Sequence, residues 1–195
     1  MGQYFTNEQL PSNITKYNTK ILSNSFNFYT DNGVFSKSKL DFGTRVLLEN
    51  IPIETIHGEI LDVGCGYGVI SIILSKITSC HFDGVDVNKR ALHLAEMNKK
   101  ENKVDNVTFI ESNCYEKINK KYDLIITNPP IRAGKKIVYE IIMNAKNYLK
   151  AKGTLYLVIH KDQGAKSAVK DLEKVYKVSI INKVKGFFVI KCEID

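Results

Sequence analysis

The sequence lacks the segments that direct a chain to a membrane or across it. It contains no uninterrupted apolar run near the roughly 20 residues that a helix needs to span a bilayer. Residues 1–10 also lack the basic stretch followed by an apolar one that is typical of a secretory signal. We therefore expect a cytoplasmic protein that does not enter a membrane.

Cysteine is sparse and is not spaced for metal binding. The four cysteines form no CxxC pair, and none has a histidine partner at the spacing of metal ligands. The sequence therefore indicates neither a metal site nor a disulfide framework, and reduced thiols are expected. Internal repeats and low-complexity linkers are missing too, so residues 1–195 are interpreted as a single domain.

Acidic residues are fewer than basic ones, which leaves a net charge of +7. An excess of Lys and Arg favours a polyanionic partner, because these side chains neutralise phosphates and release bound counterions. The lysines are spread along the chain rather than clustered, and arginine is scarce, so genome composition explains the charge as well as function does. Charge alone leaves nucleic-acid binding open.

From residue 59 onward, short apolar runs alternate with helical patterns, which is typical of repeated βα units. We predict an α/β Rossmann-like core over 51–195, with a mostly parallel seven-stranded sheet, helices on both faces and an antiparallel C-terminal edge. An extension over 1–50 precedes it. The predicted strands span 59–63, 81–87, 107–110, 122–127, 154–159, 177–181 and 187–192. Helices are expected over 67–77, 135–150, 165–175 and after Asn88, with one or two strands within 20–29 and a helix over 37–50.

A glycine-rich turn joins the first core strand to its helix. Glycine tolerates positive φ and has no side chain, so such a turn lets a ligand approach the backbone closely. Gly64, Gly66 and Gly68 have the spacing GxGxG, whereas the dinucleotide fingerprint that receives a pyrophosphate is GxGxxG. The spacing therefore favours a ligand without a pyrophosphate.

Two acidic residues further restrict the class of ligand that the turn can bind. Asp62 directly precedes the glycines, where it would repel a phosphate but suits a cationic ammonium group such as that of a methionine moiety. Asp86 ends the next strand, where a carboxylate can accept hydrogen bonds from both hydroxyls of a ribose. Together they favour S-adenosylmethionine as the cofactor. The plainer interpretation makes Asp62 a turn residue and Asp86 a charge at a helix entry.

Other cofactor contacts are expected in the same loops, next to these residues. Asn113 follows the third core strand, where its side-chain amide could meet an adenine, although an Asn in a loop is more often a turn residue. The remaining expected contacts are Cys65, Val87 and Cys114. Both cysteines are interpreted as small buried residues and not as nucleophiles.

The sequence Asn128-Pro129-Pro130-Ile131 directly follows a strand that is expected to be buried. Consecutive prolines restrict the backbone and remove two N–H donors, so the local carbonyls and the Asn128 amide oxygen form a rigid acceptor array. Such an array would accept both hydrogens of a planar NH2 group and orient its nitrogen toward a sulfonium methyl. No Pro-Cys pair is present, which argues against carbon methylation through a cysteine nucleophile. Standing alone, the motif would be only a turn that ends a strand.

Together these motifs resemble class I methyltransferases that act on amino groups. An upstream stretch, with Gly33-Val34-Phe35-Ser36, Leu40-Asp41 and Gly43-Thr44, is similar to the small-subunit (16S) ribosomal RNA guanine-N2 methyltransferase C family. This resemblance implies a class I methyltransferase fold and an acceptor at the exocyclic amine of a guanine in 16S ribosomal RNA. It also implies that Phe35, Asp41 and Thr44 help to enclose the cofactor.

Two features depart from that family. Its members usually have Tyr or Phe after Asn-Pro-Pro, where the ring can stack on the target base, whereas this chain has Ile131. Because such stacking is worth about 1–3 kcal/mol, either Ile131 makes a weaker apolar contact or another residue stacks on the base. Many members also carry a second, degenerate N-terminal domain, whereas we expect this chain to be the single-domain form.

Three basic residues, Arg132, Lys135 and Lys136, follow the motif and are expected to line the rim that the RNA backbone would approach. An ordinary solvated helix start explains them equally well. Three other functions stay open: methylation of a glutamine side-chain amide in a translation factor, methylation of adenine at N6, and ribosome assembly with little catalysis.

Overall fold

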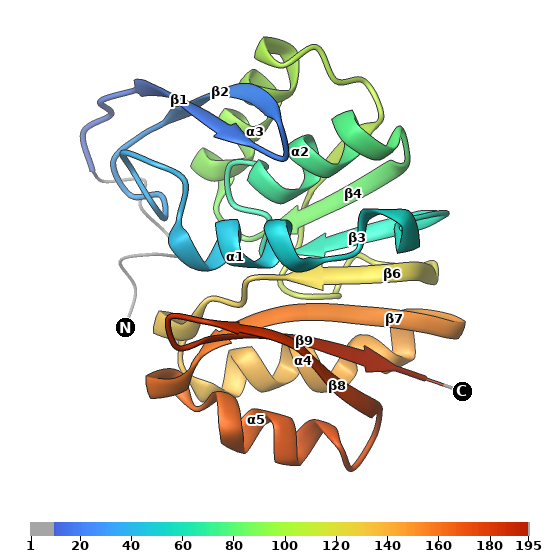
Figure 1. Cartoon of the computed structure of the whole chain (residues 1–195). Coiled ribbons are helices and arrows are strands. Elements are labelled where there is room, and N and C mark those ends of the chain that lie inside the picture. The colour runs from blue at the N-terminus through green and yellow to red at the C-terminus, as the bar shows by residue number, and fades with distance from the viewer. Residues whose placement is uncertain (1–9, 195) are drawn as a thin grey trace.

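Figure 1 shows the computed structural model of the chain, which describes residues 10–194. The part of the predicted extension that precedes Leu10 lies outside the described residues. The strands are β1 (Thr15–Ile21), β2 (Asn24–Thr30), β3 (Glu59–Val63), β4 (His81–Asp86), β5 (Val107–Glu111), β6 (Tyr122–Thr127), β7 (Leu149–His160), β8 (Lys177–Val184) and β9 (Phe187–Glu193). The helices are α1 (Phe42–Asn50), α2 (Val69–Thr78), α3 (Lys89–Glu101), α4 (Lys135–Tyr148) and α5 (Ala165–Leu172), and three short 3-10 helices are η2 (Ile53–Thr55), η3 (Ile131–Ala133) and η4 (Lys161–Gln163).

Seven strands form the central sheet in the order β5-β4-β3-β6-β7-β9-β8. The first five in this order are parallel, whereas β9 is antiparallel to both of its neighbours. The predicted Rossmann-like class is therefore confirmed. The antiparallel strand lies one place inside the edge, because the β8–β9 hairpin pairs with β7 through its second strand.

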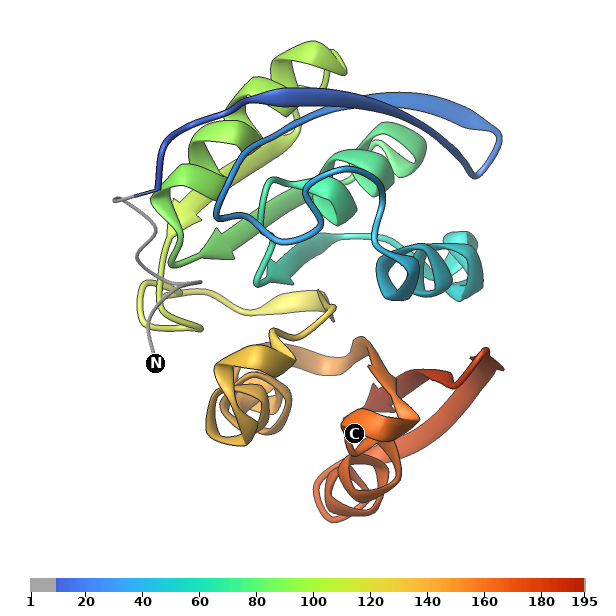
Figure 2. The same cartoon turned by 90° about the vertical axis from the view of Figure 1, so that its left-hand side faces the viewer.

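Helices cover both faces of this sheet, with α1, α2 and α3 on one face and α4 and α5 on the other (Figures 1 and 2). Successive residues of a strand point to opposite faces. In β6, Leu124 and Ile126 join the hydrophobic cluster under α1–α3, whereas Ile125 joins the cluster under α4 and α5. The continuous apolar runs of the sequence follow from this, because both faces of the central strands are buried.

Several predicted boundaries need correction. The helix predicted over 37–50 begins only at Phe42, because the Asp41 side chain caps it by accepting from Thr44 N at 2.8 Å. The helix predicted over 135–150 ends at Tyr148, since Leu149 already pairs with β6 as the first residue of β7. The helix predicted over 165–175 ends at Leu172.

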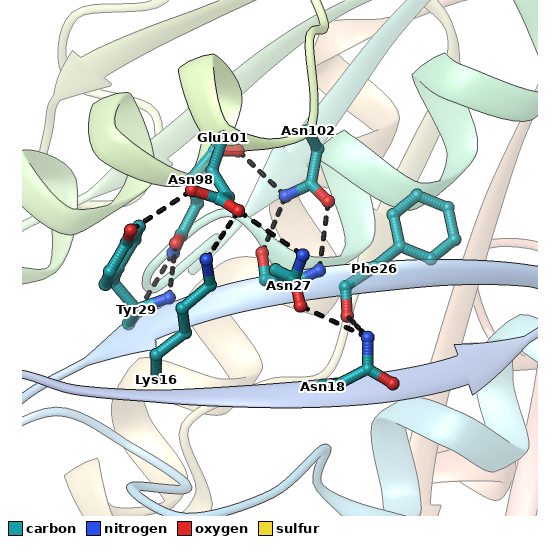
Figure 3. Close-up of polar contacts among 8 residues, drawn as sticks. All are labelled: Lys16, Asn18, Phe26, Asn27, Tyr29, Asn98, Glu101 and Asn102. Carbon is teal, nitrogen blue, oxygen red and sulfur yellow. Dashed lines mark hydrogen bonds and ion pairs between the residues drawn. The ribbon is translucent and has the colours of Figure 1, made fainter.

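The strands expected within 20–29 form a hairpin that starts earlier, at Thr15. Its two-residue turn, Leu22-Ser23, has positive φ at both positions, which suits the twist of a hairpin but is unusual without Gly or Asn. The hairpin lies over α3, and Figure 3 shows the polar contacts that attach it. Asn98 of α3 accepts from Tyr29 N at 2.6 Å and donates to Tyr29 O at 3.0 Å.

Asn98 also connects the hairpin to the glycine-rich turn, because its Nδ2 donates to Tyr67 O at 3.0 Å. The Tyr67 hydroxyl lies 2.9 Å from that of Tyr17 in β1 and donates to Ser36 O at 3.1 Å. The N-terminal segment is thus fixed to the turn from two sides. Within the described residues, none of the helices is long and apolar enough to cross a membrane.

Candidate active site

A cavity of about 330 Å³ opens at the carboxyl ends of β3, β4 and β6. Ligand sites of α/β sheets form at this edge, where loops from several strands converge. Most of the predicted site residues line it: Phe35, Asp41, Thr44, Gly64, Cys65, Gly66, Asp86, Val87, Asn113, Cys114, Asn128, Pro129, Pro130, Ile131 and Arg132. Asp62, Gly68, Lys135 and Lys136 do not line it.

The three glycines of the turn have different surroundings. A Cβ atom at Gly66 would meet nothing within 4 Å, and one at Gly64 would meet only Pro130 Cδ, at 3.8 Å. Both residues have positive φ and present bare backbone to the cavity. At Gly68, a Cβ would lie 2.7 Å from Phe109 Cζ, so this glycine is required by packing between α2 and β5. Gly68 does not line the cavity, so its expected cofactor contact stays a prediction, and the contact seen here is its packing against Phe109.

Asp62 lies beneath the glycine-rich turn and is completely buried. Its Oδ2 accepts from Ser71 Oγ at 2.6 Å and from Ser71 N at 3.2 Å, whereas its Oδ1 has no hydrogen-bond partner. Burial raises the pKa of Asp62 to about 7. Asp62 does not line the cavity, so its expected interaction with an ammonium group of the ligand stays a prediction.

Asp86 faces the cavity from the end of β4 and is fixed by backbone amides. Its Oδ2 accepts from Gly66 N and its Oδ1 accepts from Asn88 N, both at 2.8 Å. Burial raises the pKa of Asp86, and the backbone N–H groups oppose that rise. The backbone of Val87 also contacts this carboxylate, which keeps acceptor capacity for the hydroxyls of a diol.

Residues that follow β5 line the same half of the cavity as Asp86. The exposed Asn113 donates from Nδ2 to Glu116 Oε1 at 2.8 Å, so part of its amide is occupied within its own turn. Burial raises the pKa of the Cys65 thiol and brings that of Cys114 to about 11. Both cysteines are therefore protonated wall residues, as expected, and neither supplies a thiolate.

The other half of the cavity is built around Asn128. Its Nδ2 donates to Asp41 Oδ2 at 3.0 Å and to Thr44 Oγ1 at 2.9 Å. A carboxylate can only accept, so the Asp41 contact fixes which end of the Asn128 amide carries the nitrogen. Both N–H donors are used, and the Oδ1 acceptor is the part of the amide that remains for a ligand.

Pro129 and Pro130 continue this wall without any N–H donor. The chain then enters η3, in which Ile131 is half-buried and packs against the cluster under α4 and α5. Arg132 follows at the exposed rim, whereas Lys135 extends over the Tyr139 ring with Nζ 4.8 Å from its centroid. Lys136 is exposed, so of the three predicted rim residues only Arg132 reaches the cavity.

Two wall residues that come from the C-terminal third of the chain, one polar and one aromatic, were not predicted. Gln163 of η4 and Phe187 at the start of β9 both line the cavity. Neither lies in a motif, and only the antiparallel pairing of β9 with β7 brings Phe187 to this edge. Among residues 10–194, no cluster of three or more His, Cys, Asp or Glu side chains could hold a metal ion.

Comparison with known proteins agrees with this geometry. Residues 25–191 match the methyltransferase small domain family. The chain is 38% identical to the uncharacterised protein YbxB of Bacillus subtilis over 99% of both chains. It is 37% identical to ribosomal RNA small subunit methyltransferase C of Psychromonas ingrahamii over 66% of this chain and 38% of that protein. A release factor glutamine methyltransferase of Fusobacterium nucleatum is 43% identical over 54% of this chain and 31% of its own length.

A solved structure has the same fold over nearly the whole chain. The 16S rRNA N2 methyltransferase RsmC of T. thermophilus, in complex with AdoMet and guanosine, superposes with a TM-score of 0.84. The match covers 95% of this chain and 52% of that one, at 23% sequence identity. On the strength of the matched sequence, the glycine-rich turn and the cavity, the chain belongs to the methyltransferase small domain family of S-adenosylmethionine-dependent methyltransferases.

Proposed function

We propose that this methyltransferase transfers the methyl group to the exocyclic N2 amine of a guanine in 16S ribosomal RNA. The observation that carries the proposal is the Asn128 amide, held with its oxygen as the remaining acceptor by Asp41 and Thr44. A planar amine bonded to a ring needs such an acceptor, because its lone pair is otherwise delocalised into the ring.

The cavity fits S-adenosylmethionine in three ways. Its volume of about 330 Å³ is in the range of small-molecule sites. The open position at Gly66 leaves backbone for a close approach, and the anchored Asp86 carboxylate can accept from the two ribose hydroxyls. The unpartnered Oδ1 of Asp62 adds a favourable field for the amino-acid ammonium. When bound, the cofactor supplies an electrophilic methyl group.

The residues of the acceptor wall position the amine for that group. Asn128 Oδ1 and the neighbouring backbone carbonyl accept its two hydrogens, which draws electron density to the nitrogen and points its lone pair into the cavity. Because the motif has two prolines and the amide is held at both N–H groups, little reorganisation is needed. Positioning and electrostatics then account for catalysis, and no strong base is required.

An RNA substrate agrees with the charge and with the relatives. The net charge of +7 favours phosphate binding, and Arg132 lies at the mouth of the cavity. Lys135 and Lys136 follow at the start of α4, outside the cavity, where they would meet the backbone flanking a flipped base. The relatives that carry a functional name include several ribosomal RNA small subunit methyltransferases C.

The second candidate is methylation of a glutamine side-chain amide. The identity of 43% to a release factor glutamine methyltransferase favours it, and an amide NH2 fits the same acceptor wall. That match covers only 54% of the chain, and Ile131 occupies the place where both groups usually have an aromatic ring. The positive rim favours the RNA.

The substrate is tested by incubating the purified protein with tritiated S-adenosylmethionine and, in separate reactions, 16S ribosomal RNA, small subunits, transfer RNA and a release factor. Labelled RNA is then digested to nucleosides. We expect label in N2-methylguanosine from 16S RNA or from the subunit. Label in the release factor would assign the enzyme to glutamine, label in N6-methyladenosine would change the base, and cofactor binding without any transfer would favour the assembly role.

A further inference from the structure

Ile131 leaves the acceptor wall without the aromatic ring that usually follows Asn-Pro-Pro. The structure places Ile131 in η3, half-buried against the cluster under α4 and α5. A branched aliphatic side chain offers no flat π-face to a base. If the acceptor is a nucleobase, its stacking partner must come from elsewhere in the cavity.

Phe187 is an aromatic wall residue on the acceptor side. An ideal Cβ at Gly43 would lie 2.8 Å from Phe187 Cε1 and 3.1 Å from Asp41 Oδ2, so the edge of the ring and that carboxylate oxygen both lie against Gly43. The same Asp41 oxygen accepts from Asn128 Nδ2 at 3.0 Å. The Phe187 ring therefore lies next to the group that orients the acceptor array.

The ring is held in place by its neighbours. Phe187 follows a two-residue turn, Lys185-Gly186, in which both residues have positive φ, as in the tight hairpin turns that twisted strands prefer. The rings of Phe42 and His160 contact it in edge geometries, with centroid separations of 5.6 Å and 4.7 Å. A fixed ring loses little conformational entropy when a ligand stacks on it.

The charge around this ring suits a nucleotide. Lys185 lies in the turn that precedes Phe187, and its Nζ is 5.5 Å from the centroid of the Phe42 ring that contacts Phe187. Lys185 is exposed, so its ammonium group can also meet a phosphate. Proteins that bind single-stranded nucleic acids combine aromatic rings with basic side chains in this way.

We propose that Phe187 is the aromatic residue on which the acceptor base stacks, in place of the ring missing at position 131. This inference rests on the proposed function, because it requires a base as the acceptor. Phe35 also lines the cavity and is exposed, whereas Phe187 is half-buried, but the neighbour of Phe35, Ser36, accepts from Tyr67 of the glycine-rich turn. That contact places Phe35 on the cofactor side.

The test compares Phe187→Leu, Phe187→Tyr, Phe35→Leu and Phe42→Leu with the wild type. Phe42→Leu is an intermediate variant, because this ring holds Phe187 by contact but does not line the cavity. Calorimetry with S-adenosylmethionine and thermal unfolding establish that each variant folds and binds the cofactor. KM and kcat are then measured with 16S ribosomal RNA. Quenching of 2-aminopurine riboside, which carries an amine at the position of guanine N2, is measured with S-adenosylhomocysteine present.

We expect Phe187→Leu to raise KM for the RNA about tenfold and to abolish the quenching, with cofactor affinity unchanged. Phe187→Tyr should restore both, and Phe42→Leu, which loosens the Phe187 ring without removing it, should raise KM less than Phe187→Leu does. Wild-type KM and quenching in Phe187→Leu would overturn the stacking role, and so would their loss in Phe35→Leu instead. Transfer by the wild type to a release factor and not to RNA would overturn the proposed function and this inference with it.

Discussion

Asn128 Nδ2 lies 3.0 Å from Asp41 Oδ2, and this contact joins the motif after β6 to the N-cap of α1. The same Asp41 oxygen accepts from Thr44 N at 2.8 Å. Asp41 and Thr44 were predicted to help enclose the cofactor, and both line the cavity. Their hydrogen bonds give them a second role, because they hold the Asn128 amide that faces the acceptor.

Thr44 gives a sharp test of this positioning role. Thr44→Val keeps the shape of the side chain but removes the acceptor for one Asn128 N–H group, which leaves that donor unsatisfied. We expect kcat to fall about tenfold, corresponding to about 1.4 kcal/mol, with cofactor affinity within threefold of the wild type. Single-turnover transfer and calorimetry measure the two quantities.

The matched variant Thr44→Ser keeps the hydroxyl and should restore kcat to within threefold. If Thr44→Val and Thr44→Ser lose activity equally, the methyl group rather than the hydrogen bond matters, and the positioning role is wrong. If both variants lose cofactor affinity instead, Thr44 acts as the cofactor contact that the sequence resemblance implies.

The sequence predicts the core well because its signals are local. The turn with Gly64 and Gly66, the strand end at Asp86 and the motif at Asn128 each lie at the carboxyl end of a parallel strand, so they meet in one cavity. The residue pattern cannot report which glycine faces a ligand. Gly68 packs on the Phe109 ring of β5, a contact that depends on the tertiary fold.

Long-range pairing explains what the sequence did not predict. The N-terminal hairpin was placed too late because its turn, Leu22-Ser23, has no glycine or asparagine to mark it. Gln163 reaches the cavity at the carboxyl end of β7, which is parallel to β6, whereas Phe187 reaches it only through the antiparallel pairing of β9 with β7. The hydrophobic pattern of the C-terminal third predicts its strands and helices. It does not predict which of its side chains lie at the edge of the sheet that forms the cavity.

Asp62 predicts a specific pH dependence of stability. Its pKa is about 7 in the folded chain against an ordinary value of 3.8, so between about pH 4 and 7 the folded state holds a proton that the unfolded state has lost. The free energy of unfolding contributed by this group is therefore highest near pH 4 and falls as pH rises to 7, by about 4 kcal/mol at most.

Asp62→Asn should remove that decline, because the amide does not titrate. Urea unfolding of both proteins at intervals between pH 4 and 8 measures the difference. We expect the wild type to lose stability relative to Asp62→Asn as pH rises, and we expect the variant to bind S-adenosylmethionine more weakly at pH 8. Parallel stability curves for the two proteins would show that the Asp62 carboxyl titrates near its ordinary pKa.

Alanine substitutions at Gly66 and Gly68 should affect different properties, namely cofactor affinity at Gly66 and stability at Gly68. Gly68→Ala forces a methyl group to within 2.7 Å of the Phe109 ring at positive φ, so we expect a loss of about 3 kcal/mol of stability. Gly66→Ala meets open space and carries only the backbone strain, about 1 kcal/mol. Its methyl group enters the cavity, so cofactor affinity should fall more than tenfold.

Thermal unfolding and calorimetry on both alanine variants test this division. Equal stability losses in the two variants would contradict the packing role of Gly68. Unchanged cofactor affinity in Gly66→Ala would show that the ligand does not approach the backbone at this point of the turn.

Asn98 is expected to be the main attachment of the N-terminal hairpin. Its completely buried amide bonds to both backbone groups of Tyr29 and to Tyr67 O, so Asn98→Ala should lower stability by about 3 kcal/mol. Asn102→Ala, which removes similar bonds to Asn27 at a more exposed site, should cost less. Hydrogen exchange at β1 and β2 should accelerate more in Asn98→Ala, and equal exchange in the two variants would rule out the special role of Asn98.

The central claim is that the Asn128 amide promotes methyl transfer without holding the cofactor. Asn128→Ala removes the amide oxygen from the acceptor wall but leaves Gly66 and Asp86 intact. Single-turnover transfer to 16S ribosomal RNA and calorimetry with S-adenosylmethionine are measured side by side for this variant and the wild type. We predict cofactor affinity within threefold of the wild type and a transfer rate lowered about 100-fold or more. A transfer rate within threefold of the wild type would contradict the account.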